Sequence, residues 1–331
     1  MQIEAVELFH FRFPTTDTVL VRLESAGMSG WGEACLPQEP VDSSEWAGSV
    51  FACLREFLGP AALRQSLVSG DLLQTALKRF QGNPFAKSAL DAAWWDLEAR
   101  THATTVAALL GGTREELKTS LTFDVMPTID DLLQAIDQHP SRTAETLVIL
   151  KFRPGWDIQT VRAVRQVFAA IPLAVDCDAR FDLGDRDTFY RLDDFMLRWI
   201  EQPFAADDLV AHAMLQETIR TPICLHESIC SLARVEQAIE LNSCRAIKLD
   251  PNLLGGLTPS RAIYDACQGS QIALAAGMRA ATSVGVDTIH ALAALADFSL
   301  PTEFIQPATL EKLDLANRQH LLDIAIAHAV L

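Results

Sequence analysis

The stretch TLVILKFRPGWD, residues 146–157, carries the pattern that decides the fold, because an apolar run of strand-forming residues ends in one charged residue. The same pattern recurs downstream in LAVD, WIE, CLH and AIK. The residues that close these runs are Lys151, Asp176, Glu201, His226 and Lys248, at spacings of 25, 25, 25 and 22 residues. Such regular spacing predicts equivalent positions in consecutive strand–helix units.

Short apolar runs with strand-forming residues alternate with helical patterns through this whole region. The runs lie at residues 120–123, 147–152, 173–175, 197–200, 222–225, 246–249, 272–275 and 303–305. Eight strands alternating with helices predict an α/β fold, a (β/α)₈-type barrel over residues 111–310. A doubly wound open sheet is the alternative, but it usually has a glycine-rich first turn, which we do not find here.

The first 110 residues have strand patterns followed by helical patterns, which predicts an α+β domain. Residues 3–13 and 18–24 alternate apolar and polar side chains as strands do, and helical patterns follow from residue 43. One helix is expected at residues 84–100, with Asn83 as its N-cap and Pro84 in its first position. The tail, residues 311–331, is expected to be a helix that packs back on this domain.

Composition and charge exclude several classes of protein. The chain has 331 residues, of which 49% are hydrophobic and 21% charged, as in a globular protein with a large core. A net charge of −16 without a basic cluster argues against nucleic-acid binding. No apolar stretch is long enough to span a membrane, and the start does not read as a signal peptide. Seven scattered cysteines favour reduced thiols, so we expect a cytoplasmic protein.

The residues that close the runs predict a reaction, since active sites of such barrels lie at the carboxyl ends of the strands. Two lysines flank three possible metal ligands, Asp176, Glu201 and His226. This set suits proton abstraction next to a carboxylate, in which a divalent cation stabilises the enediolate and lysines act on the α-carbon. Each residue also has an ordinary alternative: a surface lysine, a carboxylate that caps a helix, or a hydrogen-bonded structural histidine.

Further residues lie at the same rim and are expected to support the ligands or to contact substrate. They are Asp178, Glu227, Ser228, Asp250, Gly277 and Met278.

With these residues the chain resembles the enolase superfamily, in particular its branch of o-succinylbenzoate synthases and N-acylamino acid racemases. The matching segments are GWGEA (30–34), KSALDAAWWDLEAR (87–100), LLGG (109–112), KFRPGWD (151–157), VDCDARF (175–181), IEQPFAADDL (200–209), TPICLHESI (221–229) and IKLDPNLLGGL (247–257). The resemblance implies a capping domain, residues 1–110 joined by 311–331, over a modified TIM barrel. It also implies Mg²⁺ on Asp176 and Glu201, and Lys151 and Lys248 as acid/base residues.

The chain departs from this family in three places. His226 stands where the family has an aspartate as third magnesium ligand, and imidazole favours a softer ion such as zinc or iron. Ile149 replaces the first lysine of the family's K-x-K pair. The segment after Phe13 runs almost directly into the next strand, where the family has a longer mobile loop that covers the substrate.

Three hypotheses for the function follow. The first is a lyase like o-succinylbenzoate synthase, which dehydrates a cyclohexadiene carboxylate in menaquinone biosynthesis. The second is an isomerase of the N-acylamino acid racemase type. The third is a degenerate homologue that binds without catalysis, with an empty metal site. The expected partner is a small carboxylate substrate, with no nucleic acid and no membrane, and a homo-oligomer is left open.

Overall fold

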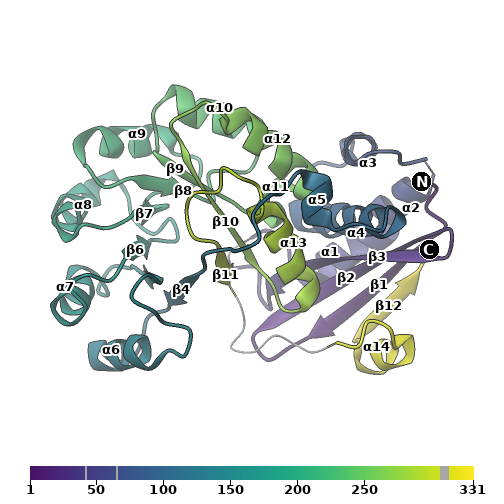
Figure 1. Cartoon of the computed structure of the whole chain (residues 1–331), viewed down its shortest axis with the longest axis horizontal. Coiled ribbons are helices and arrows are strands. Elements are labelled where there is room, and N and C mark those ends of the chain that lie inside the picture. The colour runs from purple at the N-terminus through teal and green to yellow at the C-terminus, as the bar shows by residue number, and fades with distance from the viewer. Residues whose placement is uncertain (42, 65, 306–312) are drawn as a thin grey trace.

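A parallel sheet of eight strands, with the helices that connect them, forms the larger part of the computed structural model (Figure 1). The structure describes residues 1–41, 43–64, 66–305 and 313–331. The strands are β4 (Ser120–Phe123), β5 (Leu147–Lys151), β6 (Leu173–Asp176), β7 (Ile200–Glu201), β8 (Ile223–Leu225), β9 (Ala246–Leu249), β10 (Ala273–Arg279) and β11 (Glu303–Ile305). They pair in chain order from β4 to β11. The predicted strand–helix barrel is therefore confirmed.

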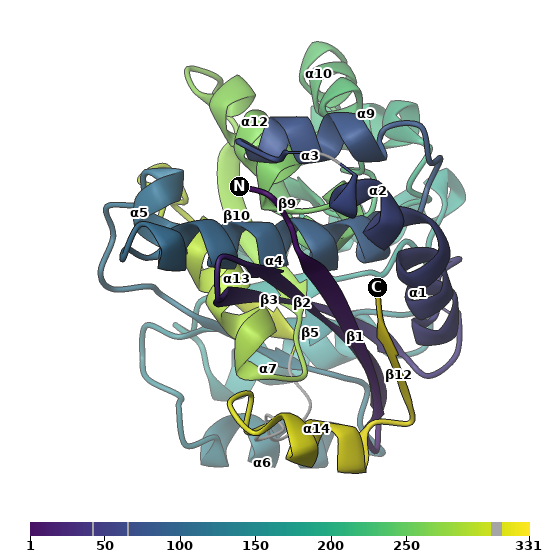
Figure 2. The same cartoon turned by 90° about the vertical axis from the view of Figure 1, so that its right-hand side faces the viewer.

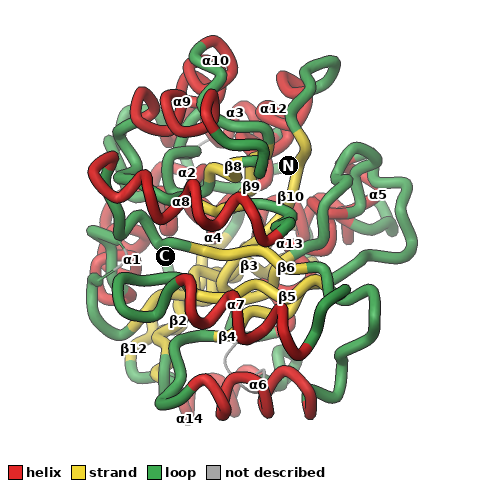
Figure 3. The backbone as a smooth tube through the Cα atoms, turned by 90° about the vertical axis from the view of Figure 1, so that its left-hand side faces the viewer, coloured by secondary structure: helices red, strands yellow, loops and turns green. Residues whose placement is uncertain are grey.

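The first and last strands of this sheet approach each other at their amino ends. Thr119 and Thr302 form a parallel bridge, and the Ser120 N–H donates to the Thr302 carbonyl at 3.0 Å. The connecting helices lie around the outside of the strands (Figure 3). They are α6 (Ile129–Gln138), α7 (Ile158–Val167), η2 (Leu183–Asp185), α8 (Arg186–Leu192), η3 (Asp193–Phe195), α9 (Leu209–Thr218), α10 (Leu232–Glu240), α11 (Pro251–Leu254), α12 (Leu257–Cys267) and α13 (Ser283–Ala293).

Alternation along each strand divides the side chains into two sets. One set packs under the helices and includes Val148, Val175 and Ile247. The other set faces the interior of the curled sheet, where its apolar members form a separate cluster. These are Leu147, Ile149, Ala174, Trp199, Cys224 and Ala246. The residues two positions further along several of these strands are the predicted site residues, so the strand register alone brings them to one end.

A second, antiparallel sheet in the order β12–β1–β2–β3 belongs to the amino-terminal part. Its strands are β1 (Ala5–Arg12), β2 (Thr16–Ser25), β3 (Met28–Pro37) and β12 (Ala327–Val330). The turn between β1 and β2 is tight, since the Phe13 N–H donates to the Thr16 carbonyl at 2.8 Å. Helices α1 (Ala47–Cys53), η1 (Leu54–Leu58), α2 (Gly59–Leu63), α3 (Gly70–Leu77), α4 (Pro84–Thr101) and α5 (Val106–Leu110) follow it.

The carboxyl-terminal tail returns to this sheet, but not as the single helix expected from the sequence. Helix α14 (Arg318–Ile324) is short, and β12 then pairs with β1, with Phe9 opposite His328 (Figure 2). The alternation in AHAV is too brief to distinguish a strand from a helix end by its pattern. The expected boundary at residues 310 and 311 lies outside the described residues.

Helix α4 packs directly on β3 because two glycines of the GWGEA segment leave room for it. A Cβ atom at Gly30 or Gly32 would collide with the backbone of α4 near Ala93 and Ala89. Asn83 is the N-cap residue and Pro84 begins the helix, as expected, but Asn83 is left-handed, with φ of 55°, and its side chain makes no cap hydrogen bond. The Glu45 carboxylate accepts the Phe85 N–H at 3.0 Å instead, a contact across 40 residues of sequence.

Two buried carboxylates connect the amino-terminal part to the barrel. Glu33 on β3 accepts the N–H groups of Ala281 and Gly285, at 2.6 and 2.9 Å, at the start of α13. Asp91 on α4 accepts the Thr258 N–H at 3.0 Å, at the start of α12. Both carboxylates thus stabilise helix amino termini, where negative charge is favoured.

All seven cysteines lie in the described residues and are unpaired, and five of them are buried. In the described part of the chain, no helix combines the length and the apolar composition needed to cross a bilayer.

Candidate active site

The structure brings the five predicted residues together at one end of the parallel sheet. Lys151 lies opposite Asp176 in the register of β5 and β6, and Asp176 lies opposite Glu201 on β7. Lys248 and His226 both approach Glu201, from β9 and from the segment after β8. Since this is the end where the strands finish, it is the expected place for chemistry in such a fold.

Lys151 is held by two carboxylates. Its Nζ atom lies 2.6 Å from an Asp176 oxygen and 2.5 Å from an Asp178 oxygen. Burial alone would lower the pKa of Lys151, but the charges of Asp176 and Asp178 outweigh it and raise this pKa above its usual value. Burial would likewise raise the pKa of Asp176, but Lys151 and Lys248 lower it to about 2. Lys151 is therefore a charged ammonium group in this arrangement.

Lys248 is enclosed more completely, by Glu201 and by a residue that the sequence did not reveal, Glu303. Its side chain is 1% exposed, and its Nζ atom donates to both glutamates. Burial would lower the pKa of Lys248, but Glu201 and Glu303 raise it well above its usual value. A sequence signal for Glu303 was present, because it begins the eighth apolar run, but it is the first residue of its strand, whereas the other site residues lie at or next to the last residue of theirs.

His226 lies among three carboxylates. Its Nδ1 atom is 3.5 Å from a Glu201 oxygen and 3.7 Å from a Glu227 oxygen, and its Nε2 atom is 3.6 Å from Asp250. Burial lowers the pKa of His226, but Glu227 and Asp250 outweigh it and raise this pKa to about 9. An imidazolium ion has no free lone pair, so His226 cannot act as a metal ligand in this form.

These contacts do not fit a Mg²⁺ site. Magnesium requires oxygen ligands in near-octahedral geometry, whereas the two carboxylates here bind ammonium groups and the third position is an imidazole. Among the described residues, no group of three His, Cys, Asp or Glu side chains has the arrangement of a metal site.

Five of the six rim residues expected from the sequence lie at this end of the sheet, and Met278 does not. Asp178 and Ser228 make hydrogen bonds at the mouth, to Lys151 and to Gln202. Glu227 and Asp250 face His226, and Gly277 lies against the Lys248 side chain. Met278 was wrongly included, because it points to the opposite face of β10 and packs in the core under the helices. The alternation along a strand excludes two adjacent residues from one face.

The two other departures from the family pattern are also visible. Ile149 is fully buried in the apolar cluster inside the sheet, two residues before Lys151 on the same face. The tight turn after Phe13 leaves no extended loop between β1 and β2. The charged end of the barrel therefore has one cation fewer than the family pattern implies.

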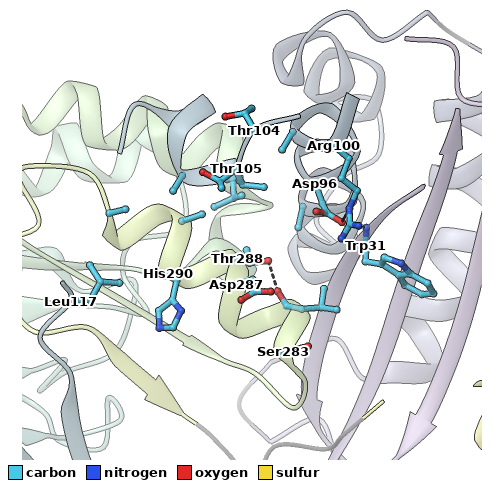
Figure 4. Close-up of a pocket in the computed structure, with 18 of the residues that line it drawn as sticks. Trp31, Asp96, Arg100, Thr104, Thr105, Leu117, Ser283, Asp287, Thr288 and His290 are labelled. Carbon is cyan, nitrogen blue, oxygen red and sulfur yellow. Dashed lines mark hydrogen bonds and ion pairs between the residues drawn. The ribbon is translucent and has the colours of Figure 1, made fainter. Parts of the chain in front are cut away.

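A cavity of about 720 Å³ lies elsewhere, between α4, α5 and α13. Figure 4 shows Asp96 and Arg100 of α4 on one side of it, and Asp287 and His290 of α13 on the other. None of the predicted site residues lines it. The cavity is therefore separate from the lysine–carboxylate cluster.

Two family models match the chain over most of its length. Residues 9–111 match the mandelate racemase / muconate lactonizing enzyme N-terminal domain, and residues 134–327 match the enolase C-terminal domain-like family. The chain therefore belongs to the enolase superfamily.

The chain is similar to o-succinylbenzoate synthases and to N-succinylamino acid racemases. The chain is 36% identical to an o-succinylbenzoate synthase of Geobacillus kaustophilus, over 87% of this chain and 77% of that one. It is 33% identical to an N-succinylamino acid racemase of Thermus thermophilus, over 91% and 85% of the two chains. A solved enolase-superfamily structure from Listeria innocua is 30% identical, covers 91% of this chain and 85% of its own, and superposes with a TM-score of 0.85.

Proposed function

We propose that this protein is a lyase of the o-succinylbenzoate synthase type, acting in menaquinone biosynthesis in the cytoplasm. The observation that carries the proposal is the pair of lysines at the ends of β5 and β9, with carboxylates between them. The identity to o-succinylbenzoate synthases over most of the chain supports this choice of reaction.

In the proposed reaction a hydroxylated cyclohexadiene carboxylate loses its α-proton and its hydroxyl group as water. Lys151 takes the proton from the α-carbon, and the charged Lys248 stabilises the enediolate that forms. The resulting Lys151 ammonium group then gives this proton to the hydroxyl group as its C–O bond breaks, so that water leaves. Lys151 is an ammonium ion held by Asp176 and Asp178, so it must release a proton before it can accept one from the α-carbon. The enclosed position of Lys248 suits a group that remains charged throughout.

Racemisation of an N-acylamino acid is the second candidate. It begins with the same proton abstraction, and the racemase relatives are nearly as similar as the synthases. The two reactions differ in the second step, because racemisation returns a proton to the opposite face of the α-carbon. Lys248 must then lose a proton, which its two glutamate partners oppose.

Assays of the purified protein with each substrate, in parallel, test this proposal. Metal analysis comes first, and each assay is then run with Mg²⁺, Mn²⁺, Zn²⁺ and Fe²⁺. Dehydration that is lost in Lys151→Ala supports the synthase, and racemisation alone supports the second candidate. Absence of both activities with every ion contradicts both and leaves the degenerate homologue.

A further inference from the structure

Gly277 and Glu303 contact Lys248, and Thr122 holds Glu303; the proposed reaction gives none of these three residues a role. They come from the last two strands of the sheet and from the first, which meet where the sheet closes. Lys248 is among the largest fully buried side chains of the chain, although it carries a charge. Holding a charge there requires partners on every side.

Gly277 provides the space for the aliphatic part of the lysine. In the register of β9 and β10, Lys248 lies opposite Ala275, and Gly277 is the next residue on the same face. A Cβ atom at Gly277 would lie 3.2 Å from Lys248 Cγ, which is a tight contact, and 2.7 Å from Cδ, which is too close, so the lysine side chain would have to shift. The lysine side chain therefore runs across Gly277, and any larger residue would displace it.

Glu303 binds the ammonium group at the end of the Lys248 side chain. It lies opposite Gly277 in the register of β10 and β11, and one of its oxygens accepts a hydrogen bond from Lys248 Nζ. Its other oxygen accepts the Thr122 hydroxyl, which comes from β4 across the closure of the sheet. Both oxygens of Glu303 are thus fixed, and through them so is the position of the Lys248 ammonium group.

We propose that Gly277, Glu303 and Thr122 form a socket that positions Lys248, with Glu303 as its principal positioning residue. The role of Lys248 in the reaction rests on the proposed function, but the socket does not. Glu303 acts through Lys248 and not on the substrate. Its negative charge and its reach are both needed, because the ammonium group lies between it and Glu201.

Two substitutions of Glu303 distinguish positioning by charge from mere packing. Glu303→Gln keeps the shape and removes the charge, whereas Glu303→Asp keeps the charge and shortens the side chain. A packing role predicts that Gln is tolerated better than Asp. The socket predicts the reverse: kcat falls about 100-fold in Glu303→Gln with little change in KM, and less in Glu303→Asp. The matched control is Glu45→Gln, which alters a buried carboxylate that accepts hydrogen bonds from the start of α4.

A second measurement needs no turnover. The folded proteins are treated briefly with an acetylating reagent, and the modification of Lys248 is read by mass spectrometry against the exposed Lys78. Lys248 is expected to be protected in the native protein and in Glu45→Gln. Its labelling should rise about tenfold in Glu303→Gln and in Gly277→Ala, because a side chain without its socket samples open positions.

The kinetic and labelling measurements distinguish a failure of the proposed function from a failure of the socket. If the native protein dehydrates no substrate, the proposed function is wrong and the labelling alone decides the socket. Unchanged labelling of Lys248 in folded Glu303→Gln and Gly277→Ala, or a kcat in Glu303→Gln above that of Glu303→Asp, overturns the socket. If Glu303→Gln does not fold, Thr122→Val carries the same labelling test, since it removes the hydroxyl that fixes Glu303.

Discussion

Two layers of side chains fill the interior of the parallel sheet, and the same strands build both. The lower layer is apolar, with Ile149, Ala174 and Trp199 among its members. Two residues further along the same strands, the upper layer consists of Lys151, Asp176 and Glu201. Side chains two residues apart share a face of the strand, so both layers point into the interior of the sheet. The inward residues in the middle of the strands pack against one another, whereas those at the carboxyl ends lie where active sites of such folds are found.

The layers also differ in what they contribute to stability. Burial of the apolar layer stabilises the fold in proportion to its area. The upper layer places several charges out of water, where ion pairs at best offset the loss of hydration. We therefore expect the charged upper layer to serve the reaction and the apolar lower layer to stabilise the fold. Trp199 links the two, since its Nε1 atom donates to a Glu201 oxygen at 3.2 Å.

Lys151→Ala is the strongest test of the upper layer. If Lys151 is the base, kcat of the proposed dehydration falls about 1,000-fold or more, while the protein remains folded because the apolar layer is untouched. Enzyme kinetics and circular dichroism measure the two effects. The paired control is Ile149→Val, two residues away on the same face, which should lower the free energy of unfolding by about 1 kcal/mol and leave kcat nearly unchanged. Turnover that survives in Lys151→Ala would remove it from the mechanism.

Trp199→Ala is the corresponding test of the lower layer. Trp199 is 1% exposed, so its removal leaves a cavity inside the sheet and should lower the free energy of unfolding by about 4 kcal/mol. Denaturant unfolding measures this loss. The control is Trp46→Ala, because Trp46 is 47% exposed and its loss should have little effect. Similar losses in the two variants would show that the apolar layer is not what stabilises the barrel.

The positions of the upper-layer residues could be predicted from the sequence because strand register is local. Each apolar run has one orientation, so the residue at its end needs only the strand assignment to be placed. Glu303 could not be placed in this way, since its contact with Lys248 depends on how the last strand meets the first. The same limit applies to the cap of α4, where the Glu45 side chain, 40 residues away in sequence, accepts the hydrogen bond that Asn83 does not, and to β12, which pairs with β1 from the other end of the chain.

Asp91 of α4 differs from the carboxylates of the upper layer, which pair with lysines. Asp91 is fully buried and accepts hydrogen bonds from Thr258 and Gln74, but it has no ion-pair partner among the contacts described for it. Burial raises the pKa of Asp91 from 3.8 to about 6. The folded state therefore holds this proton at a pH where the unfolded state has released it. Stability from this group is complete below about pH 4 and is lost as the pH rises to 6.

Asp91→Asn should remove this contribution. The difference in free energy of unfolding between pH 4 and pH 7 is expected to change by about 3 kcal/mol relative to the native protein. Urea unfolding at both pH values measures it, and Asp207→Asn provides the same change at an exposed position. An equal pH dependence in the native protein and in Asp91→Asn would contradict this assignment.

The third ligand position gives the smallest expected effect and the sharpest test of the upper layer. In the described arrangement, Asp176 and Glu201 bind lysines and His226 carries a proton, so an incoming Mg²⁺ must displace two ammonium groups and meets a third positive charge. We therefore expect weak Mg²⁺ binding by the native protein. His226→Asp replaces that charge by an oxygen ligand and should strengthen binding at least about tenfold. Calorimetric titration measures both, with His102→Asp as the control for net charge at an exposed position. Tight Mg²⁺ binding by the native protein, without improvement in His226→Asp, would contradict this expectation. It would show that Mg²⁺ displaces the lysines from Asp176 and Glu201 and that His226 does not prevent magnesium from binding.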